Sequence, residues 1–194
     1  MHVSTLWLSL SLAASPGSAS SAARATFSPD EAPEALQPAI AKADAATQIL
    51  QRRLSGRLGE AMKEGGPARA VKVCRDEASR IAGEVSAKSG VALGRTTDRL
   101  RSARNAPPAW AQPIVEAARG KRASDVKPVA VDLGDRVGVL RPIAVGGACL
   151  GCHGTPDRIA PDVKAHLAAA YPRDAANGYA EGDHRGFFWA EVAR

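Results

Sequence analysis

The apolar residues in the first half of the chain recur at intervals of three and four. From Glu34 onward this spacing continues through Leu36, Ile40, Ala43, Thr47, Leu50, Leu54, Leu58 and Ala61. Such a period predicts a long amphipathic helix. Gly65-Gly66-Pro67 predicts its end and the start of a second helix. The second apolar stripe consists of Val71, Cys74, Ala78, Ile81 and Val85 and ends before Ser89-Gly90. We therefore expect two helices packed as a hairpin, with Cys74 on the inward face.

The second half of the chain reads as strands with helical inserts. Short strands are predicted at Val91–Arg95 and Gly186–Val192, and a β-hairpin joins 126–133 to 136–145 across Gly134-Asp135. Helices are predicted at 107–119 and 159–171. Helices followed by strands of this kind favour an α+β domain with an antiparallel sheet.

The pentad Cys149-Leu150-Gly151-Cys152-His153 follows the second hairpin strand. C-x-x-C-H is the attachment motif of c-type haem, in which each thiol joins one vinyl group and the histidine becomes an axial iron ligand. A Cys149–Cys152 redox pair is the alternative, but it needs a strand-to-helix βαβ setting and Gly146-Gly147 precedes the motif instead. The pentad occurs once, so we expect one covalent haem.

The N-terminus is typical of an export signal. A short apolar run from Leu6 to Ala14 is followed by a Ser/Ala/Gly-rich stretch that ends at Ala25. This run is too short to span a bilayer, and haem c is attached outside the cytoplasmic membrane. We therefore predict a signal peptide over 1–25, a leader over 26–33, one domain over 34–194, and a location in the periplasm.

The charge pattern argues against nucleic acid as a partner. The formal net charge is +6, but the basic groups at Arg52-Arg53 and between Arg95 and Arg104 lack interleaved aromatic side chains. A solvated basic face is the simpler interpretation, and a docking patch for an acidic redox partner is the alternative.

A longer signature follows the pentad. Residues 171–179 read Tyr-Pro-Arg-Asp-Ala-Ala-Asn-Gly-Tyr, and residues 182–186 read Gly-Asp-His-Arg-Gly. With the pentad, residues 70–74 and Arg95-Thr96-Thr97, this pattern resembles a family of single-haem c-type proteins with a PAS-like fold. Its members are free-standing exported proteins or sensory domains. The resemblance covers about 34–193 and implies a PAS-like antiparallel sheet flanked by the N-terminal helical hairpin.

One loop departs from that family's pattern, which often reads Arg-Asn-Pro-x-Asn-x-Pro ahead of a Trp. Here Arg101, Asn105, Pro107 and Trp110 remain, but the Asn-Pro is lost. The role of this loop in haem access or partner contact is therefore open for this chain.

The second axial ligand has four candidates, which are Cys74, Met62, His166 and His184. A buried free cysteine is usually a small core residue, yet an unpaired thiol is unusual in an exported protein. The resemblance also implies that the upstream helical cysteine faces the haem, so Cys74 is our predicted ligand opposite His153.

Two arginines are predicted to contact the haem propionates. Arg95 and Arg185 could each form a bidentate guanidinium–carboxylate contact, and the alternative for both is an ordinary surface charge. The cofactor-binding set is therefore Cys149, Cys152, Arg95 and Arg185.

The predicted ligation bears on the choice of function. A thiolate stabilises ferric iron, so a His/Cys haem is expected at low potential. We predict a haem-binding protein in redox or gas sensing, with an unidentified redox or signalling partner. The alternative is a low-potential electron carrier, which the end of the chain directly after the last predicted strand favours. A peroxidase ranks last, because its acid–base group could come only from His166 or His184; no enzymatic activity is expected.

Overall fold

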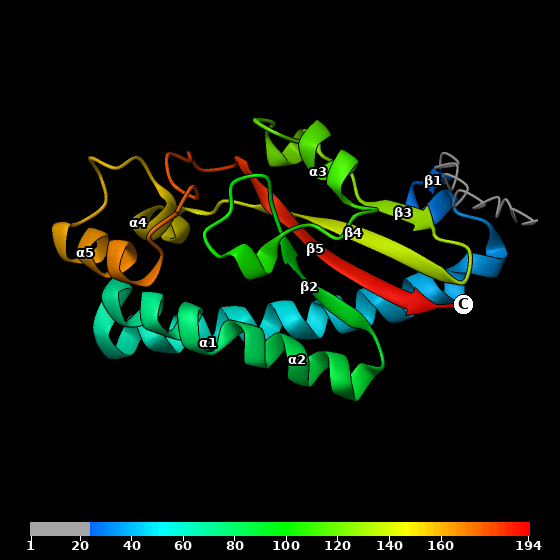
Figure 1. The fold of residues 1–194 in the computed structure, drawn as a ribbon, viewed down its shortest axis with the longest axis horizontal. Helices are drawn as coiled ribbons and strands as arrows, with labels where there is room; N and C mark the ends of the chain where they lie inside the picture. Colours follow the sequence, from blue (N-terminus) through cyan, green and yellow to red (C-terminus); the bar gives the residue numbers. More distant parts are fainter. Residues whose placement is uncertain (1–23) are drawn as a thin grey trace, which may run out of the picture.

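The computed structural model describes residues 24–194, so nearly all of the predicted signal peptide lies outside the described residues. The fold is α+β (Figure 1), which confirms the predicted class. The helices are α1 Gln37–Asp76, α2 Ala78–Ser89, α3 Gln112–Ala117, α4 Leu150–His153 and α5 Pro161–Ala170. The strands are β1 Thr26–Phe27, β2 Ala92–Thr96, β3 Val129–Asp132, β4 Arg136–Ala144 and β5 His184–Ala193. The strands pair antiparallel in the order β1-β3-β4-β5-β2.

The predicted helical hairpin lies along the sheet (Figure 1). Helix α1 is interrupted at Gly65 and Gly66, whose backbone angles are not helical and whose φ values are −168° and +65°. The chain reverses there, so that the later part of α1 and all of α2 run back beside the first part. Arg57 and Glu77, twenty residues apart in sequence, form an ion pair of 2.9 Å across this hairpin. The glycine pair therefore ends the first helical arm and lets the chain reverse, as the sequence predicts.

The sheet separates two apolar layers, because alternate residues of a strand point to opposite faces. On β5, Phe188 packs with the side chains of the hairpin, whereas Phe187 packs on the other face beside Trp110 and Leu140. Phe187 and Leu140 are fully buried. The long strands β4 and β5 thus carry the core, and the end of β4 and the start of β5 lie toward α4 (Figure 1).

Residues 107–119, predicted as one helix, contain only the short α3 preceded by turns. Pro107, Pro108 and Pro113 lack the backbone N–H that a continuous helix needs. The segment 26–33, set apart as a leader, contributes β1 at the sheet edge and the buried side chain of Pro29.

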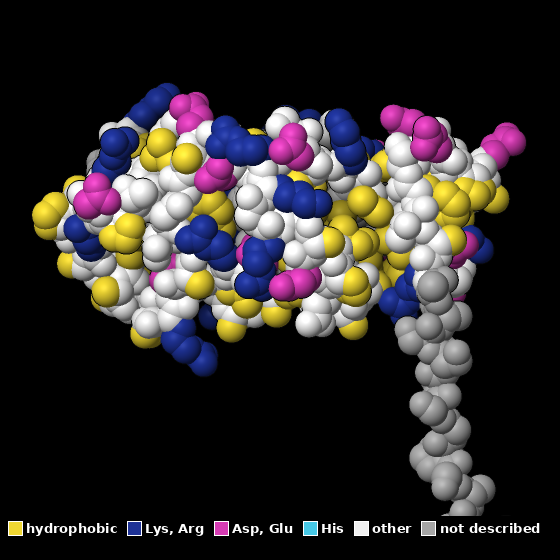
Figure 2. All heavy atoms as spheres, turned by 90° about the horizontal axis from the view of Figure 1, so that it is seen from above, with side chains coloured by type: hydrophobic (Ala, Val, Ile, Leu, Met, Phe, Trp, Pro, Cys, Tyr) yellow, Lys and Arg dark blue, Asp and Glu magenta, His cyan; other side chains and the backbone are white. Residues whose placement is uncertain are grey.

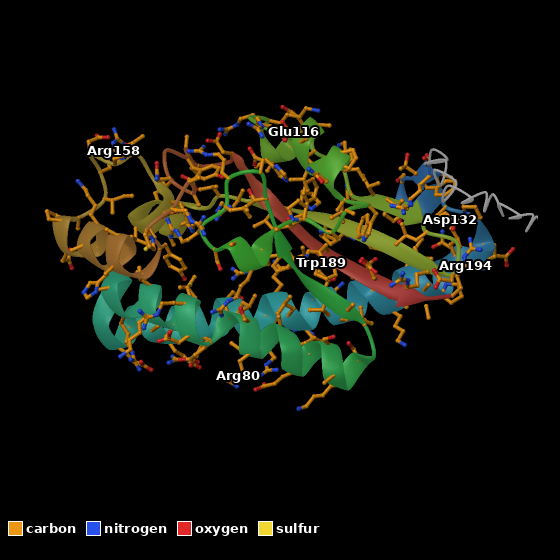
Figure 3. All side chains as sticks on the ribbon, viewed as in Figure 1. Arg80, Glu116, Asp132, Arg158, Trp189 and Arg194 are labelled. Atoms are coloured by element: carbon orange, nitrogen blue, oxygen red, sulfur yellow. The ribbon has the colours of Figure 1, made fainter. Side chains whose placement is uncertain are left out.

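The surface shows mixed charge. Lys and Arg side chains are interspersed with Asp and Glu over the face in Figure 2. Asp132 and Arg194 pair at 2.6 Å at one end of the molecule, and Arg158 lies at the other end beside α4 and α5 (Figure 3). Among residues 24–194, no helix combines the length and the apolar character needed to cross a membrane.

Candidate functional site

The pentad forms a single helical turn after β4. A 3-10 turn over Gly147–Cys149 leads directly into α4. Cys149, Cys152 and His153 are spaced i, i+3 and i+4, so the turn places their side chains on one face. All three are partly buried. The motif therefore has the local geometry in which two thiols and one imidazole serve a common group.

The imidazole of His153 is fixed through one of its two nitrogens. Nδ1 lies 2.7 Å from the carbonyl oxygen of Ala176, which can only accept, so Nδ1 donates and Nε2 keeps its lone pair. Burial, together with the nearby Arg185 and Arg101 cations, lowers the pKa of His153 to about 3. His153 is therefore a neutral imidazole with a free Nε2, which is the form that binds a metal.

A second chain segment holds the pentad in place. The backbone N–H of Tyr179 donates to the carbonyl of His153 at 3.0 Å, and that of Gly178 donates to Gly154 at 2.7 Å. Gly178 has a φ of +74°, a conformation that favours glycine. The signature after the pentad thus forms a clamp along it.

Cys74 lies on α1, beyond the glycine break, and is partly buried. Val71, one helical turn earlier, belongs to the same apolar cluster as Cys152. Burial raises the pKa of the Cys152 thiol, with Arg101 opposing and the nearby Cys74 and Cys149 thiols reinforcing the rise. The structure therefore brings Cys74 to the pentad.

Arg95 and Arg185 both lie near His153, since both charges act on its pKa. Burial lowers the pKa of Arg185, and Arg101 and Arg95 lower it further. Within residues 24–194 neither Arg95 nor Arg185 forms an ion pair with a carboxylate. The end of the sheet thus carries two guanidinium groups without anionic partners.

Tyr179 lies beside both Arg185 and His153. Its ring is under the guanidinium groups of Arg99, at 4.3 Å, and Arg185, at 5.4 Å, and meets the His153 ring edge-on at 6.3 Å. The Tyr179 hydroxyl is buried and has no hydrogen-bond partner among the described residues. An unpaired buried hydroxyl, on a ring that two cations cover, marks a place where an acceptor would fit.

The remaining ligand candidates lie at the surface or on another face of the core. Met62 is 37% exposed and His166 is on the surface of α5. His184 is buried against Phe187, on the sheet face opposite the hairpin. Burial lowers its pKa, and the neighbouring charge of Asp98 opposes this.

A surface groove of about 320 Å³ lies elsewhere, between α1 and α2. It is lined by arginines and glutamates that pair with each other, including Arg57 with Glu77. Since most of its charges are already paired and lie on the hairpin, this groove is not part of the site. Within the described range, no three His, Cys, Asp or Glu side chains are arranged to hold a bare metal ion.

Sequence reasoning missed Arg101, Asp174 and Tyr179 as parts of the site. Asp174 and Tyr179 stand in the quoted signature, and Arg101 is a residue that the departing loop retains. Their presence in the family signature and in the retained loop positions was the sequence signal that could have identified them as site residues.

Comparisons with known proteins identify the family of this chain and support its fold. The family model Tll0287-like matches residues 20–192. The crystal structure of the cyanobacterial haem protein Tll0287 aligns with 84% of this chain and 97% of its own, with a TM-score of 0.56 and 22% identity. No curated protein matches the chain. The resemblance inferred from the sequence is thereby confirmed, and the chain belongs to the Tll0287-like family.

Proposed function

We propose that this chain is an exported haem c protein in which Cys149 and Cys152 attach one haem and His153 and Cys74 bind its iron. The observation that carries the proposal is the state of His153. Its Nδ1 is bonded to a backbone carbonyl at 2.7 Å and its Nε2 is free on a neutral ring. This arrangement is common for histidines that ligate metals.

The surrounding residues fit a haem with its propionates. Arg95 and Arg185 lack anionic partners among the described residues, and the Tyr179 hydroxyl lacks an acceptor. Two carboxylates would satisfy all three groups. Membership of the Tll0287-like family, and the haem named in the related crystal structure, support the same assignment.

The bound haem would supply a one-electron couple and, if an axial ligand leaves, a position for a diatomic gas. We assign the chain to redox or gas sensing because of where Cys74 lies. The segment that carries Cys74 begins after the break at Gly65-Gly66 and continues through Glu77 into α2. Loss of the Cys74 bond would free this segment and alter the hairpin, which a signalling partner could detect. No enzymatic role is included in the proposal.

A low-potential electron carrier is the second candidate function. It would keep both axial ligands in the ferric and ferrous forms, whereas a gas sensor should bind CO when ferrous. Visible spectra of ferric, ferrous and ferrous-plus-CO protein distinguish the two functions. A ferrous spectrum that CO leaves unchanged would favour the carrier.

Covalent attachment is tested by extraction. Acid–acetone should leave the pigment on the wild-type chain, and joint Cys149→Ala and Cys152→Ala substitution should abolish attachment. Free extraction of the pigment from wild type would contradict thioether bonds. Mass spectrometry should also show a mature chain that begins near residue 25 and carries one haem; an intact Met1 on haem-loaded protein would contradict export.

Ligation by Cys74 is tested by Cys74→Ala, with Met62→Ala as the matched control. Because alanine removes an anionic donor, the ferric form should become high-spin or recruit another ligand, and its potential should rise. Met62→Ala should leave the spectra unchanged. If Cys74→Ala keeps the wild-type spin state and potential, the thiol is a core side chain and not a ligand.

A further inference from the structure

Arg101 lies at the centre of a polar network behind the pentad. Its Nη2 donates to the carbonyl of Cys152 at 2.6 Å and to that of Ala176 at 3.1 Å. Its Nε donates to Asp174 Oδ2 at 2.9 Å. The Arg101 and Asp174 side chains are only 11% and 12% exposed. A shielded ion pair, with Nε and Nη2 both 2.9 Å from Asp174 Oδ2, holds its geometry better than a surface pair does.

Ala176 is held at both of its backbone polar groups by this pair. Its N–H donates to Asp174 Oδ1 at 2.8 Å, and its carbonyl accepts from Arg101. The same carbonyl accepts the Nδ1–H of His153 at 2.7 Å. The orientation of the imidazole is therefore set by a carbonyl whose own position depends on Arg101.

We propose that Arg101, supported by Asp174, is a positioning residue that fixes the ring plane and the tautomer of His153. This inference rests on the haem-binding function proposed above. A guanidinium can bind a carboxylate and two carbonyls at once because its donors form a planar fork, whereas an ammonium is a point charge. By donating to the Ala176 oxygen, Arg101 also competes with His153 for that acceptor and moderates the electron donation of the imidazole.

Arg99 offers a matched control in the same loop. It donates to the carbonyls of Ala175, at 3.1 Å, and Asn177. Arg99 and Arg101 thus tie down the same segment at alternate residues, and only Arg101 contacts the carbonyl that His153 uses. Replacing either residue with methionine removes one cation and some anchoring, so a difference between the two variants reports on the His153 contact.

The test compares haem-loaded wild type with Arg101→Met, Arg99→Met and Arg101→Lys. Ferric electron paramagnetic resonance reads the orientation of the axial ligands, and redox titration reads the potential. We expect Arg101→Met to give more than one set of g values and a lower potential than Arg99→Met. Arg101→Lys should return the potential toward wild type, because the charge is restored, but should keep the extra g values, because the fork is lost.

Three outcomes would overturn the inference. Equal effects in Arg101→Met and Arg99→Met would mean that both arginines merely anchor the 175–177 segment and that Arg101 has no specific effect on His153. Full recovery of the spectrum in Arg101→Lys would mean that charge alone matters. Wild-type g values in every haem-loaded variant would overturn the positioning role and leave the haem function intact, whereas a wild-type chain without haem would contradict the proposed function itself.

If Arg101→Met does not fold, Asp174→Asn gives the same comparison. The amide oxygen can still accept from Ala176, while the ionic support of Arg101 is lost. Extra g values in Asp174→Asn support the role of the pair, and a wild-type spectrum overturns it.

Discussion

Replacing Gly154 with alanine should destabilise the chain. Gly154 ends α4, and a Cβ there would lie 2.6 Å from the carbonyl oxygen of Leu150. An ordinary carbon–oxygen contact is at least about 3.3 Å, so the backbone would have to move by roughly 0.7 Å. The Gly154 N–H also donates to that oxygen at 2.9 Å, and its carbonyl is held by Gly178 at 2.7 Å. Overpacking at such a restrained position costs about 1–3 kcal/mol.

Gly151, three residues earlier in the same turn, is the control. A Cβ there would meet only Pro67 Cγ, at an ordinary 3.9 Å. Gly151→Ala should stabilise the chain by roughly 0.4–1 kcal/mol, because it restricts the unfolded state. In urea unfolding followed by circular dichroism, the slope is about 1–3 kcal/mol per molar. Gly154→Ala should therefore unfold about 1 M earlier than Gly151→Ala, and coincident midpoints would refute the packing argument.

Three other predictions test the core, the buried histidine and the surface. Phe187→Ala should cost about 3–5 kcal/mol of unfolding free energy in urea because the ring is fully buried, whereas Ile49→Ala, at a site 41% exposed, should cost far less. Burial lowers the pKa of folded His184 below its unfolded value of about 6.5, so the unfolded chain binds more protons at acid pH. Stability should therefore be lost as pH falls below about 6.5, and His184→Phe should flatten that slope in pH-dependent urea melts. Arg194→Ala breaks the exposed pair with Asp132, and thermal melts should show a loss of at most about 1 kcal/mol that vanishes in high salt.

Much of the fold could be predicted because its elements are long and regular. The three-and-four spacing before Gly65 and the stripe after Pro67 identified both arms of the hairpin. The turn at Gly134-Asp135 identified the strands on either side. β1 was not predicted because a two-residue strand is too short to show an alternating pattern. Its pairing with β3 depends on tertiary contact.

The site, like the fold, could be predicted only where its residues are close together in sequence. The cysteines and His153 are neighbours in sequence, so their motif is visible in the chain. The contacts of Arg101 with Asp174 and with Ala176 span 73 and 75 residues. No local pattern encodes such pairs, because they form only when the loop after β2 meets the segment after α5.

The two proposed iron ligands are held very differently by this chain. His153 belongs to a turn that is bonded to the 174–179 segment through its imidazole and through two backbone bonds near it. Cys74 lies on a helical segment that follows the glycine break and packs through apolar contacts such as those of Val71. Apolar packing tolerates small displacements that a hydrogen-bond clamp does not. The structure therefore favours the thiolate side as the one that can move, which is where a change in ligation would reach the hairpin.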